Sequence, residues 1–408
     1  MNQAVNKKNQ KIDWLLSYQL ALAVASTLAF GTNLATYLFD IGIGPAPTTW
    51  VIVFGIATIP LIIAFSARCK YLPINLIAWC ALYLGFSAFS FLLSAQSEVI
   101  VQIFRNRFLS TAFLVINLFL ISSPNKNIEI WVRRAIFIVT IISIINIFNE
   151  LIDPSMFGGL NESGRPAGFY GNPNTAACAV ILGLIFSIGI LPLQFRLIFL
   201  AVCGLGVFLT FSRGGLIGWL MITVFFIHRQ IIPRRQSLYT ILFLLGIVIA
   251  FGISSSLLVN QLSSNLNLDD NALARLQFLL NPSLQPVNDD TSRLDIIPFA
   301  WSKFVESPIL GHGIGYTEIW GQIRPHNMYL MLIVEHGFLG ITLLPLLVFL
   351  TTVNARGEVK DIGSIFAVFI LMWGLFSHNV FEERNILLMF SLMASMNWRS
   401  QLEQQKLI

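Results

Sequence analysis

The stretch Asp289–Asn327 reads DDTSRLDIIPFAWSKFVESPILGHGIGYTEIWGQIRPHN and lies in a chain that otherwise consists almost entirely of hydrophobic segments. It carries arginines, histidines, paired carboxylates, a Gly-x-Gly-x-Gly run and two tryptophans. Ionisable groups are costly beside a lipid bilayer unless they handle something polar there. We therefore expect this stretch to be the functional cap of a membrane protein that works on a charged lipid.

The composition of the whole chain indicates a membrane protein. Of the 408 residues, 56% are hydrophobic and 11% are charged, whereas soluble domains contain about 25% charged residues. The cysteines lie in or beside apolar segments without CxxC spacing, so we expect them to be small core residues; they are Cys69, Cys80, Cys178 and Cys203.

The hydrophobic segments predict an all-α polytopic fold. A membrane-spanning helix needs about 20 apolar residues, and this rule predicts about twelve spans. The predicted spans are Trp14–Tyr37, Thr48–Ala67, Pro73–Ala95, Phe108–Ser122, Ala135–Ile152, Thr175–Leu193, Phe195–Phe211, Gly215–Ile232, Leu238–Val259, Met328–Val353, Ile362–Phe376 and Ile386–Trp398.

The loop charges predict the orientation of these spans. With the N-terminus in the cytoplasm, cytoplasmic segments hold sixteen of the 25 Lys and Arg residues, and the outer segments hold the other nine. Short cytoplasmic loops of membrane proteins carry such an excess of positive charge. We expect three parts: transmembrane helices over residues 1–259, a long periplasmic loop with short helices over 260–325, and further transmembrane helices over 326–408.

The second half of the long loop predicts a helix of its own. Ser292 and Asp295 have the spacing of a capping box, which places the helix start at Arg293. Four apolar residues then recur at helical spacing and predict a face that packs on the membrane-embedded core: Leu294, Ile297, Trp301 and Phe304.

Three outer residues could do chemistry. Arg213, in TFSRGGLIGWL, could present its guanidinium and nearby backbone N–H groups to a phosphate. Arg293 would lie at a helix start, where the dipole favours an anion. His326, in RPHNMYL, could accept a proton from a hydroxyl. The structural alternatives are a lipid headgroup contact for Arg213, a salt bridge to a nearby aspartate for Arg293 and a structural hydrogen bond for His326.

Several motifs in order resemble the O-antigen ligase and Wzy-type polymerase superfamily of bacterial glycan assembly. They are GRPAGFYGNPN at 164–174, SRGG at 212–215, SRLDIIPFAW at 292–301, SPILGHGIGY at 307–316 and HNMYLMLIVEHGFLG at 326–340. The resemblance covers about residues 164–340. It implies that Arg213, Arg293 and His326 are essential, since two outer arginines and an outer histidine in these settings are essential in the ligases.

The resemblance also implies a function. We expect an inverting glycosyltransferase, similar to the GT-C type, that moves a glycan from undecaprenyl diphosphate to lipid A–core in the bacterial inner membrane, with its active site facing the periplasm. No cofactor, metal or nucleic acid is expected, since the chain has no metal-ligand spacing, Walker loop or nucleotide fingerprint. We expect further substrate contacts from Arg165, Arg324, Trp301, Tyr316 and Asn327.

Two alternatives stay open at this point. The first is another acceptor within the same superfamily, either a lipid-linked repeat unit for a Wzy-type polymerase or a protein for a related O-glycosylating ligase. The second is a transporter or flippase, although transporters place their polar residues near the bilayer midplane and show a repeat. Some polar residues also have structural interpretations: Arg165 could lie in a surface loop, Asn172 and Asn174 could cap the next helix, and Glu335 and His336 could fix helix packing through a mutual or interhelical pairing.

Overall fold

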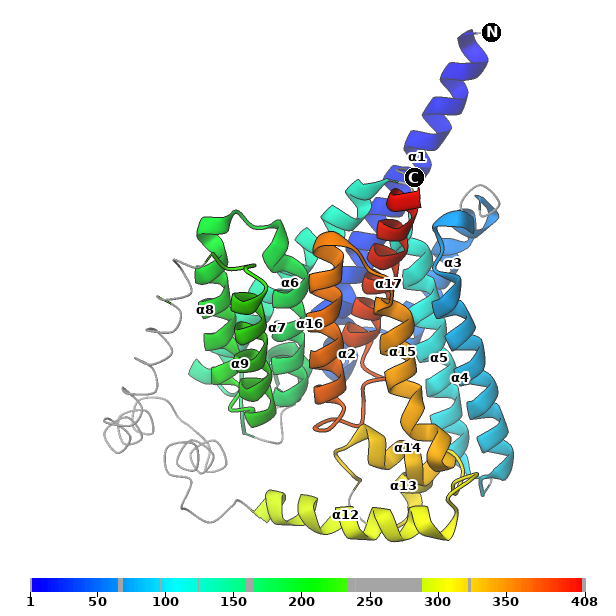
Figure 1. The fold of residues 1–408 in the computed structure, drawn as a ribbon, viewed down its shortest axis with the longest axis vertical. Helices are drawn as coiled ribbons and strands as arrows, with labels where there is room; N and C mark the ends of the chain where they lie inside the picture. Colours follow the sequence, from blue (N-terminus) through cyan, green and yellow to red (C-terminus); the bar gives the residue numbers. More distant parts are fainter. Residues whose placement is uncertain are drawn as a thin grey trace.

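The chain forms a bundle of helices that run between two ends (Figure 1). The computed structural model describes residues 2–64, 69–95, 97–123, 125–158, 164–233, 239, 288–321 and 324–405, and every regular element in these ranges is a helix. The all-α prediction is therefore confirmed for the described residues. Both termini lie at one end, the upper end in Figure 1.

The first part of the chain alternates between the two ends. Its helices are α1 (Asn2–Gly31), α2 (Leu34–Asp40), α3 (Pro47–Ile63), α4 (Ile74–Leu93), α5 (Glu98–Ile121), α6 (Lys126–Ile152), α7 (Pro173–Ser187), α8 (Leu193–Leu209) and α9 (Arg213–His228). The predicted span Leu238–Val259 and the first part of the long loop, residues 260–287, lie outside the described residues.

The chain is described again from α12, which lies across the lower end of the bundle (Figure 1). The remaining helices are α12 (Asn288–Glu306), α13 (Tyr316–Ile319), α14 (Met328–His336), the short 3-10 helix η5 (Gly337–Thr342), α15 (Leu343–Thr352), α16 (Gly357–Trp373) and α17 (Arg384–Gln405).

Side-chain caps explain where several helices begin. A side chain placed before the first turn accepts a hydrogen bond from a backbone N–H that would otherwise be unsatisfied. Ser97 does this for α5, Asn125 for α6, Asn172 for α7, Ser212 for α9 and Asn327 for α14. The predicted cap at Asn172 is confirmed, while Asn174 instead accepts a hydrogen bond from the Ser212 hydroxyl at 2.8 Å.

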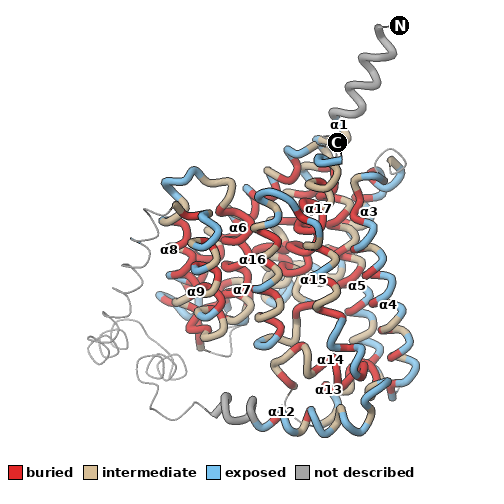
Figure 2. Tube along the Cα trace, viewed as in Figure 1, coloured by how far each residue is buried: buried red, intermediate tan, exposed pale blue. Residues whose placement is uncertain are grey.

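Two helices form the centre of the bundle. Nearly every residue of α7 is buried, and every residue of α17 from Asn385 to Asn397 is buried. Figure 2 shows this buried core between more exposed helices. A helix that buries all its faces must be surrounded by other helices. Indeed α17 packs against α1, α5, α15 and α16, and α7 packs against α6, α8, α9 and α16.

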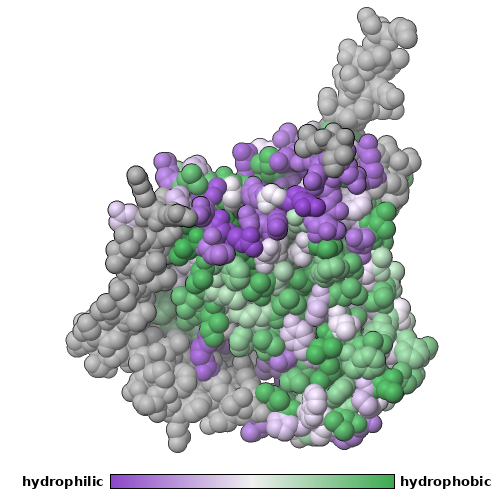
Figure 3. Space-filling view, viewed as in Figure 1, coloured by the Kyte–Doolittle hydropathy of each residue, from purple (hydrophilic) through white to green (hydrophobic). Residues whose placement is uncertain are grey.

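Six helical segments of the described residues are long and apolar enough to cross a membrane: Trp14–Gly31, Ile74–Leu93, Glu98–Ile121, Lys126–Ile152, Pro173–Ile190 and Met328–Thr352. Three shorter apolar helices are α3, α8 and α9. Figure 3 shows a hydrophobic belt below hydrophilic side chains that gather at the upper end. The number of spans, about twelve, stays a prediction.

Two predicted spans differ from the structure in their limits. The helix α5 starts at Glu98 rather than Phe108, because Ser97 caps it, and so it contains Arg107. The predicted span Met328–Val353 is divided at Gly337, whose φ of +67° ends α14 and starts η5. Both differences place ionisable groups inside the bundle.

The prediction for the helix of the long loop was partly wrong. The helix α12 begins at Asn288, five residues before the predicted start at Arg293. Its buried face is formed by Ile296 and Ala300, with Phe304 partly buried, whereas Ile297 and Trp301 are exposed. The buried face is rotated by one residue because it packs on Ile333 and Val334 of α14.

The glycines of the SPILGHGIGY motif generate a stability prediction. Gly311 has φ +70°, and a Cβ atom there would collide with the backbone of Glu335. Gly42 has a similar φ of +74° with open space around it. Left-handed backbone costs alanine about 1–2 kcal/mol at either position, but only Gly311→Ala must also move a packed helix.

We therefore expect Gly311→Ala to lower the thermal unfolding temperature of the purified protein clearly more than Gly42→Ala does. An equal loss in the two variants would show that the packing of the 307–316 loop against α14 contributes nothing to stability.

Candidate active site

The helices α7, α9, α14 and α17 are among those that begin at the lower end of the bundle (Figure 1). The loop 374–383 contacts the first turns of α7, α9 and α14 and continues directly into α17. The Phe376 ring lies beside Gly214 of α9. The Met328 N–H of α14 donates a hydrogen bond to the Gly374 carbonyl at 2.8 Å. The Thr175 hydroxyl of α7 donates a hydrogen bond to Glu383 at 3.2 Å. Helix N-termini attract anions, so this end is suited to an anionic ligand.

Arg213 is the first residue of α9 and is partly buried. The turn before it is held tightly: Phe211 has φ +51°, its carbonyl accepts a hydrogen bond from Arg165 at 3.5 Å, and the Ser212 hydroxyl accepts one from the Gly215 N–H at 3.1 Å. A fixed turn limits the directions in which the Arg213 guanidinium can extend.

Arg165 is buried and contacts this turn, so the alternative that it lies in a surface loop was wrong. Its neighbours Ala167 and Gly168 donate backbone hydrogen bonds to Glu150 of α6 at 2.6 and 2.5 Å. These hydrogen bonds anchor the loop that carries Arg165 to the bundle, next to Phe211.

His326 lies just before α14, and its ring centroid is 5.2 Å from that of His378 in the loop 374–383. Arg324 donates a hydrogen bond to His378 Nε2 at 3.2 Å and forms an ion pair with Glu318. A guanidinium has no acceptor atom, so His378 Nε2 must accept. The structure therefore brings His326 and Arg324 together with His378.

Glu383 lies beside this cluster, at the start of α17. Surrounding protein raises the pKa of the Glu383 carboxyl to about 7, although part of the side chain reaches the surface; the Thr175 hydrogen bond opposes this shift, Glu382 adds to it and Arg384 opposes it. A carboxyl that titrates near neutral pH can exchange hydrogen-bonding roles with a hydroxyl ligand.

Some polar atoms beside Glu383 have no hydrogen-bond partner among the described residues. They are the Oδ1 atom of Asn379, the Nε atom of Arg384 and the Nδ2 atom of Asn385. Buried polar atoms in folded proteins are nearly always satisfied. Two donors, one of them on a cationic guanidinium, and one acceptor at this place suit a polar ligand such as a sugar ring.

The other predicted site residues have mixed outcomes. The backbone of Arg293 belongs to α12, but its side chain lies outside the described residues. Trp301 is 55% exposed on α12. Tyr316 stacks on His312, with ring centroids 4.3 Å apart, and Asn327 Oδ1 caps α14 through the Tyr329 and Leu330 N–H groups. None of these contacts joins Trp301 or Tyr316 to the His326 cluster.

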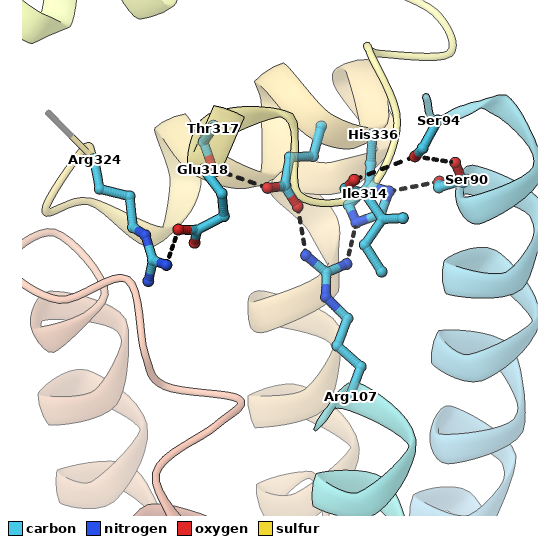
Figure 4. Close-up of polar contacts among 9 residues, drawn as sticks. Ser90, Ser94, Arg107, Ile314, Thr317, Glu318, Arg324 and His336 are labelled. Carbon is cyan, nitrogen blue, oxygen red and sulfur yellow. Dashed lines mark hydrogen bonds and ion pairs between the residues drawn. The ribbon is translucent and has the colours of Figure 1, made fainter. Parts of the chain in front are cut away.

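A fully buried charge network lies between the candidate site and α4 and α5 (Figure 4). Arg107 of α5 forms an ion pair with Glu335 and donates a hydrogen bond to His336 Nε2 at 2.7 Å. The Thr317 hydroxyl of α13 donates a hydrogen bond to Glu335 at 2.8 Å. His336 Nδ1 lies 2.7 Å from the Ser90 hydroxyl of α4. We call Ser90, Arg107, Thr317, Glu335 and His336 the Arg107 network. The predicted interhelical pairing of Glu335 and His336 is present, and its partner is Arg107.

The chemistry of the partners determines the protonation of His336. Arg107 can only donate, so His336 Nε2 accepts, and the ring proton on Nδ1 is donated to Ser90. Arg107 and Glu335 have opposite charges and His336 is neutral, which leaves the network without net charge. Each of the two Glu335 carboxylate oxygens has a donor. Such a network is stable as long as every member is present.

The network connects directly to the candidate site. Thr317, which donates to Glu335, is followed in the chain by Glu318, which pairs with Arg324. The same region is closed by backbone hydrogen bonds from His312 to Val334 at 2.9 Å and from Gly313 to Glu335 at 3.0 Å. Loss of the network should therefore displace α13 and Arg324, which pairs with Glu318 of α13.

Within the described part of the chain, no three His, Cys, Asp or Glu side chains are arranged to hold a metal ion.

Breaking the Arg107 network should be strongly destabilising. Removal of one partner of a buried ion pair costs about 3–5 kcal/mol, because the other charge stays buried without compensation. We expect Arg107→Met and Glu335→Gln each to lower the free energy of unfolding by this order, and the double variant to lose less than the sum. Purified variants would be compared by thermal and denaturant unfolding in one detergent.

The matched control is the surface pair Arg229–Asp361, 3.2 Å apart and partly exposed, for which Asp361→Asn should change stability little. Additive losses from Arg107→Met and Glu335→Gln would contradict a direct coupling between the two side chains.

Glu383 should make stability depend on pH. Its pKa in the folded protein lies above the ordinary value of 4.5, so its ionisation opposes folding. The stabilisation from this group is complete below about pH 4.5 and is lost as the pH rises through about 7. We expect the unfolding temperature of Glu383→Gln to vary less over this window than that of the natural protein. Parallel curves for the two proteins would contradict the assignment.

Two comparisons with known proteins bear on the family of the chain. A family model described as O-antigen ligase matches residues 197–345, which run from α8 to α15 and include Arg213, Arg293, Arg324 and His326. A search of curated proteins found no match to the chain. Arg107, His378 and Glu383 lie outside the matched residues, so their contacts come from the structure alone.

Members of the matched family are membrane glycosyltransferase-like enzymes, either ligases or polymerases. The match, together with six helices that are long and apolar enough to cross a membrane, indicates a multi-pass membrane protein. Residues 197–345 are thus similar to the O-antigen ligase family, and this match supports the O-antigen ligase-like superfamily.

Proposed function

We propose that the protein is an inverting, metal-independent glycosyltransferase that moves a glycan from undecaprenyl diphosphate to lipid A–core. The observation that carries this proposal is the loop 374–383, which contacts the first turns of α7, α9 and α14, begins α17, and holds His378 beside His326. One such place can hold a diphosphate, a base and a sugar at the same time.

The donor would be held by its diphosphate. Arg213 at the start of α9 and Arg324 beside His378 offer guanidinium groups, which bind phosphate oxygens with two parallel hydrogen bonds. Arg293 of α12 is proposed as a third contact from its family motif. As the bond between the anomeric carbon and the diphosphate oxygen breaks, the electron pair stays on the diphosphate, and positive groups stabilise the charge that develops there.

The acceptor would be activated by His326. Its imidazole takes the proton from an acceptor hydroxyl while that oxygen forms the new bond to the anomeric carbon, on the face opposite the leaving diphosphate. Attack from that face inverts the anomeric configuration. Glu383, Asn379 and Asn385 would hold hydroxyl groups of a sugar, since their polar atoms lie together beside this cluster.

The lower end of the bundle would face the periplasm of a bacterial inner membrane. The described segments that we predict to be cytoplasmic, such as the connections α5–α6, α7–α8 and α15–α16, lie at the upper end with both termini (Figure 1). All the segments that we predict to be cytoplasmic together hold sixteen of the 25 Lys and Arg residues, which favours a cytoplasmic upper end. The periplasmic loop 260–325 would then cover the site through α12.

A polymerase of the same superfamily is the second candidate, because the matched family contains both activities. The polymerases often carry arginine-rich motifs in two outer loops. The loop 153–174 holds a single arginine, Arg165, and it is buried against the turn before Arg213. This observation favours the ligase.

The roles of Arg213 and His326 predict different kinetic defects. Arg213→Ala should abolish transfer and weaken donor binding, and Arg213→Lys should rescue poorly because lysine lacks the bidentate fork. His326→Ala should lower turnover by about 10²–10⁴-fold, the usual contribution of a positioned base, with donor binding retained. The assay is transfer in vitro with purified lipid-linked donor and lipid A–core, alongside donor binding.

The control is His228→Ala, since His228 ends α9 at the opposite end of the bundle and is exposed. Near-normal turnover in His326→Ala would remove it as the base, and loss of donor binding in the same variant would assign it to the diphosphate instead. Transfer to a second lipid-linked repeat unit, without transfer to lipid A–core, would identify a polymerase.

A further inference from the structure

The second half of α12 has rows of residues with different surroundings. Positions four apart lie on one side of a helix, and each following position is rotated by about 100°. Ala300 and Phe304 pack on α14, and buried Ile296 continues their row. The next row, Ile297, Trp301 and Val305, is apolar and exposed by 43%, 55% and 59%.

The row beyond it is rotated by about 100° again, and includes exposed Ser302 and Glu306. Glu306 is paired with Lys303 at 2.7 Å on the polar side of the helix. The apolar row therefore lies on one flank of α12, between the row that contacts α14 and a row that faces away from it. Three large apolar side chains on one exposed flank need a non-aqueous neighbour.

This flank leads into the lipid-facing surface of a membrane-spanning segment. The chain continues from α12 to Ile309 and Leu310, exposed by 67% and 49%, and the Pro308 carbonyl before them accepts a hydrogen bond from the Phe338 N–H at 2.8 Å. Phe338 belongs to Met328–Thr352, which is apolar enough to cross a membrane, and it is 52% exposed.

The depth of this junction is given by α4. A Cβ atom at Gly313 would lie 3.1 Å from the Ser90 carbonyl oxygen and would meet the Ser94 hydroxyl, so the 307–316 loop lies beside the last turn of the span Ile74–Leu93. Leu92 in that turn is 77% exposed. The C-terminal end of α12 therefore lies beside the apolar belt of the bundle and not in the water beyond it.

We propose that α12 is an interfacial helix whose Ile297–Trp301–Val305 flank is inserted into the lipid leaflet at the lower end of the bundle. Amphipathic helices lie in this way at the boundary between headgroups and acyl chains, and tryptophan is enriched at that level. The buried row fixes α12 to α14, the apolar row contacts lipid, and Ser302 and Glu306 face headgroups and water. The proposal depends on the membrane position of the bundle and not on the proposed reaction.

The partner is the bilayer rather than another protein because the apolar flank is continuous with the exposed belt formed by Leu310, Phe338 and Leu92. An inserted α12 holds its N-terminal half, to which Arg293 belongs, at the height of lipid headgroups. Diphosphates of lipid-linked substrates lie at this height, so the position of α12 suits the proposed function without depending on it.

The test is the accessibility of single nitroxide labels on α12 in lipid nanodiscs. Cysteines replace Ile297, Trp301 or Val305 on the apolar flank, and Ser302 or Glu306 as matched controls, in a protein without its natural cysteines. Collisions with oxygen, which concentrates in lipid, are compared with collisions with a water-soluble nickel chelate. We expect the ratio of oxygen to nickel collisions to be several-fold higher at the three apolar positions than at the two controls.

Nickel accessibility at Ile297, Trp301 and Val305 equal to that at Ser302 would place the flank in water and overturn the proposal. Protection of the three labels from both reagents would mean that protein covers the flank, which overturns it as well. Dilution of labelled protein with unlabelled protein shows whether such a covering comes from a second copy, because spin–spin broadening would then decrease.

Discussion

The rest of the lower end depends on the buried ion pair between Arg107 and Glu335. A buried charge without a partner is strongly destabilising, so the chain must bring α5, the end of α14 and α13 to one point. The Ser90 and Thr317 hydroxyls satisfy the remaining polar atoms (Figure 4). Once these groups meet, Gly311 and Gly313 allow the 307–316 loop to lie against α14 and α4 at distances that a side chain would prevent.

The ion pair and the candidate active site are linked through two adjacent residues. Thr317 donates a hydrogen bond to Glu335, and Glu318 follows it in the chain. Glu318 pairs with Arg324, Arg324 donates to His378, and His378 lies beside His326. Rigid support of this kind is what catalysis by positioned groups requires, since errors of an ångström are costly. On the other side, the loop 374–383 connects the same cluster to Gly214, next to Arg213. A structural network in the bundle and a polar cluster at its end are thus parts of one arrangement.

The sequence predicted the helical fold, the superfamily and the grouping of Arg324 and His326, because hydrophobic segment length and motif order are local signals. It failed where tertiary contacts determine the outcome. Arg107 was assigned to an outer loop, since the span was started at Phe108; the cap at Ser97 was the signal that could have corrected it. The buried face of α12 was displaced by one residue, because Ile296 and Ile297 are equally apolar and only burial in the folded protein distinguishes them. The contacts of His378 with Arg324 and of Glu383 with Thr175 have no local signal, because each joins segments that are distant in sequence.

A cryo-electron microscopy structure of the protein in lipid nanodiscs with bound undecaprenyl diphosphate would test the proposed donor site directly. We predict density for the diphosphate at the lower end of the bundle, beside the loop 374–383, within hydrogen-bonding distance of the Arg213 and Arg324 guanidinium groups. His326 should then face the position of the anomeric carbon. A diphosphate bound at the upper end, or at the lower end without contact to Arg213, would contradict the proposed donor site.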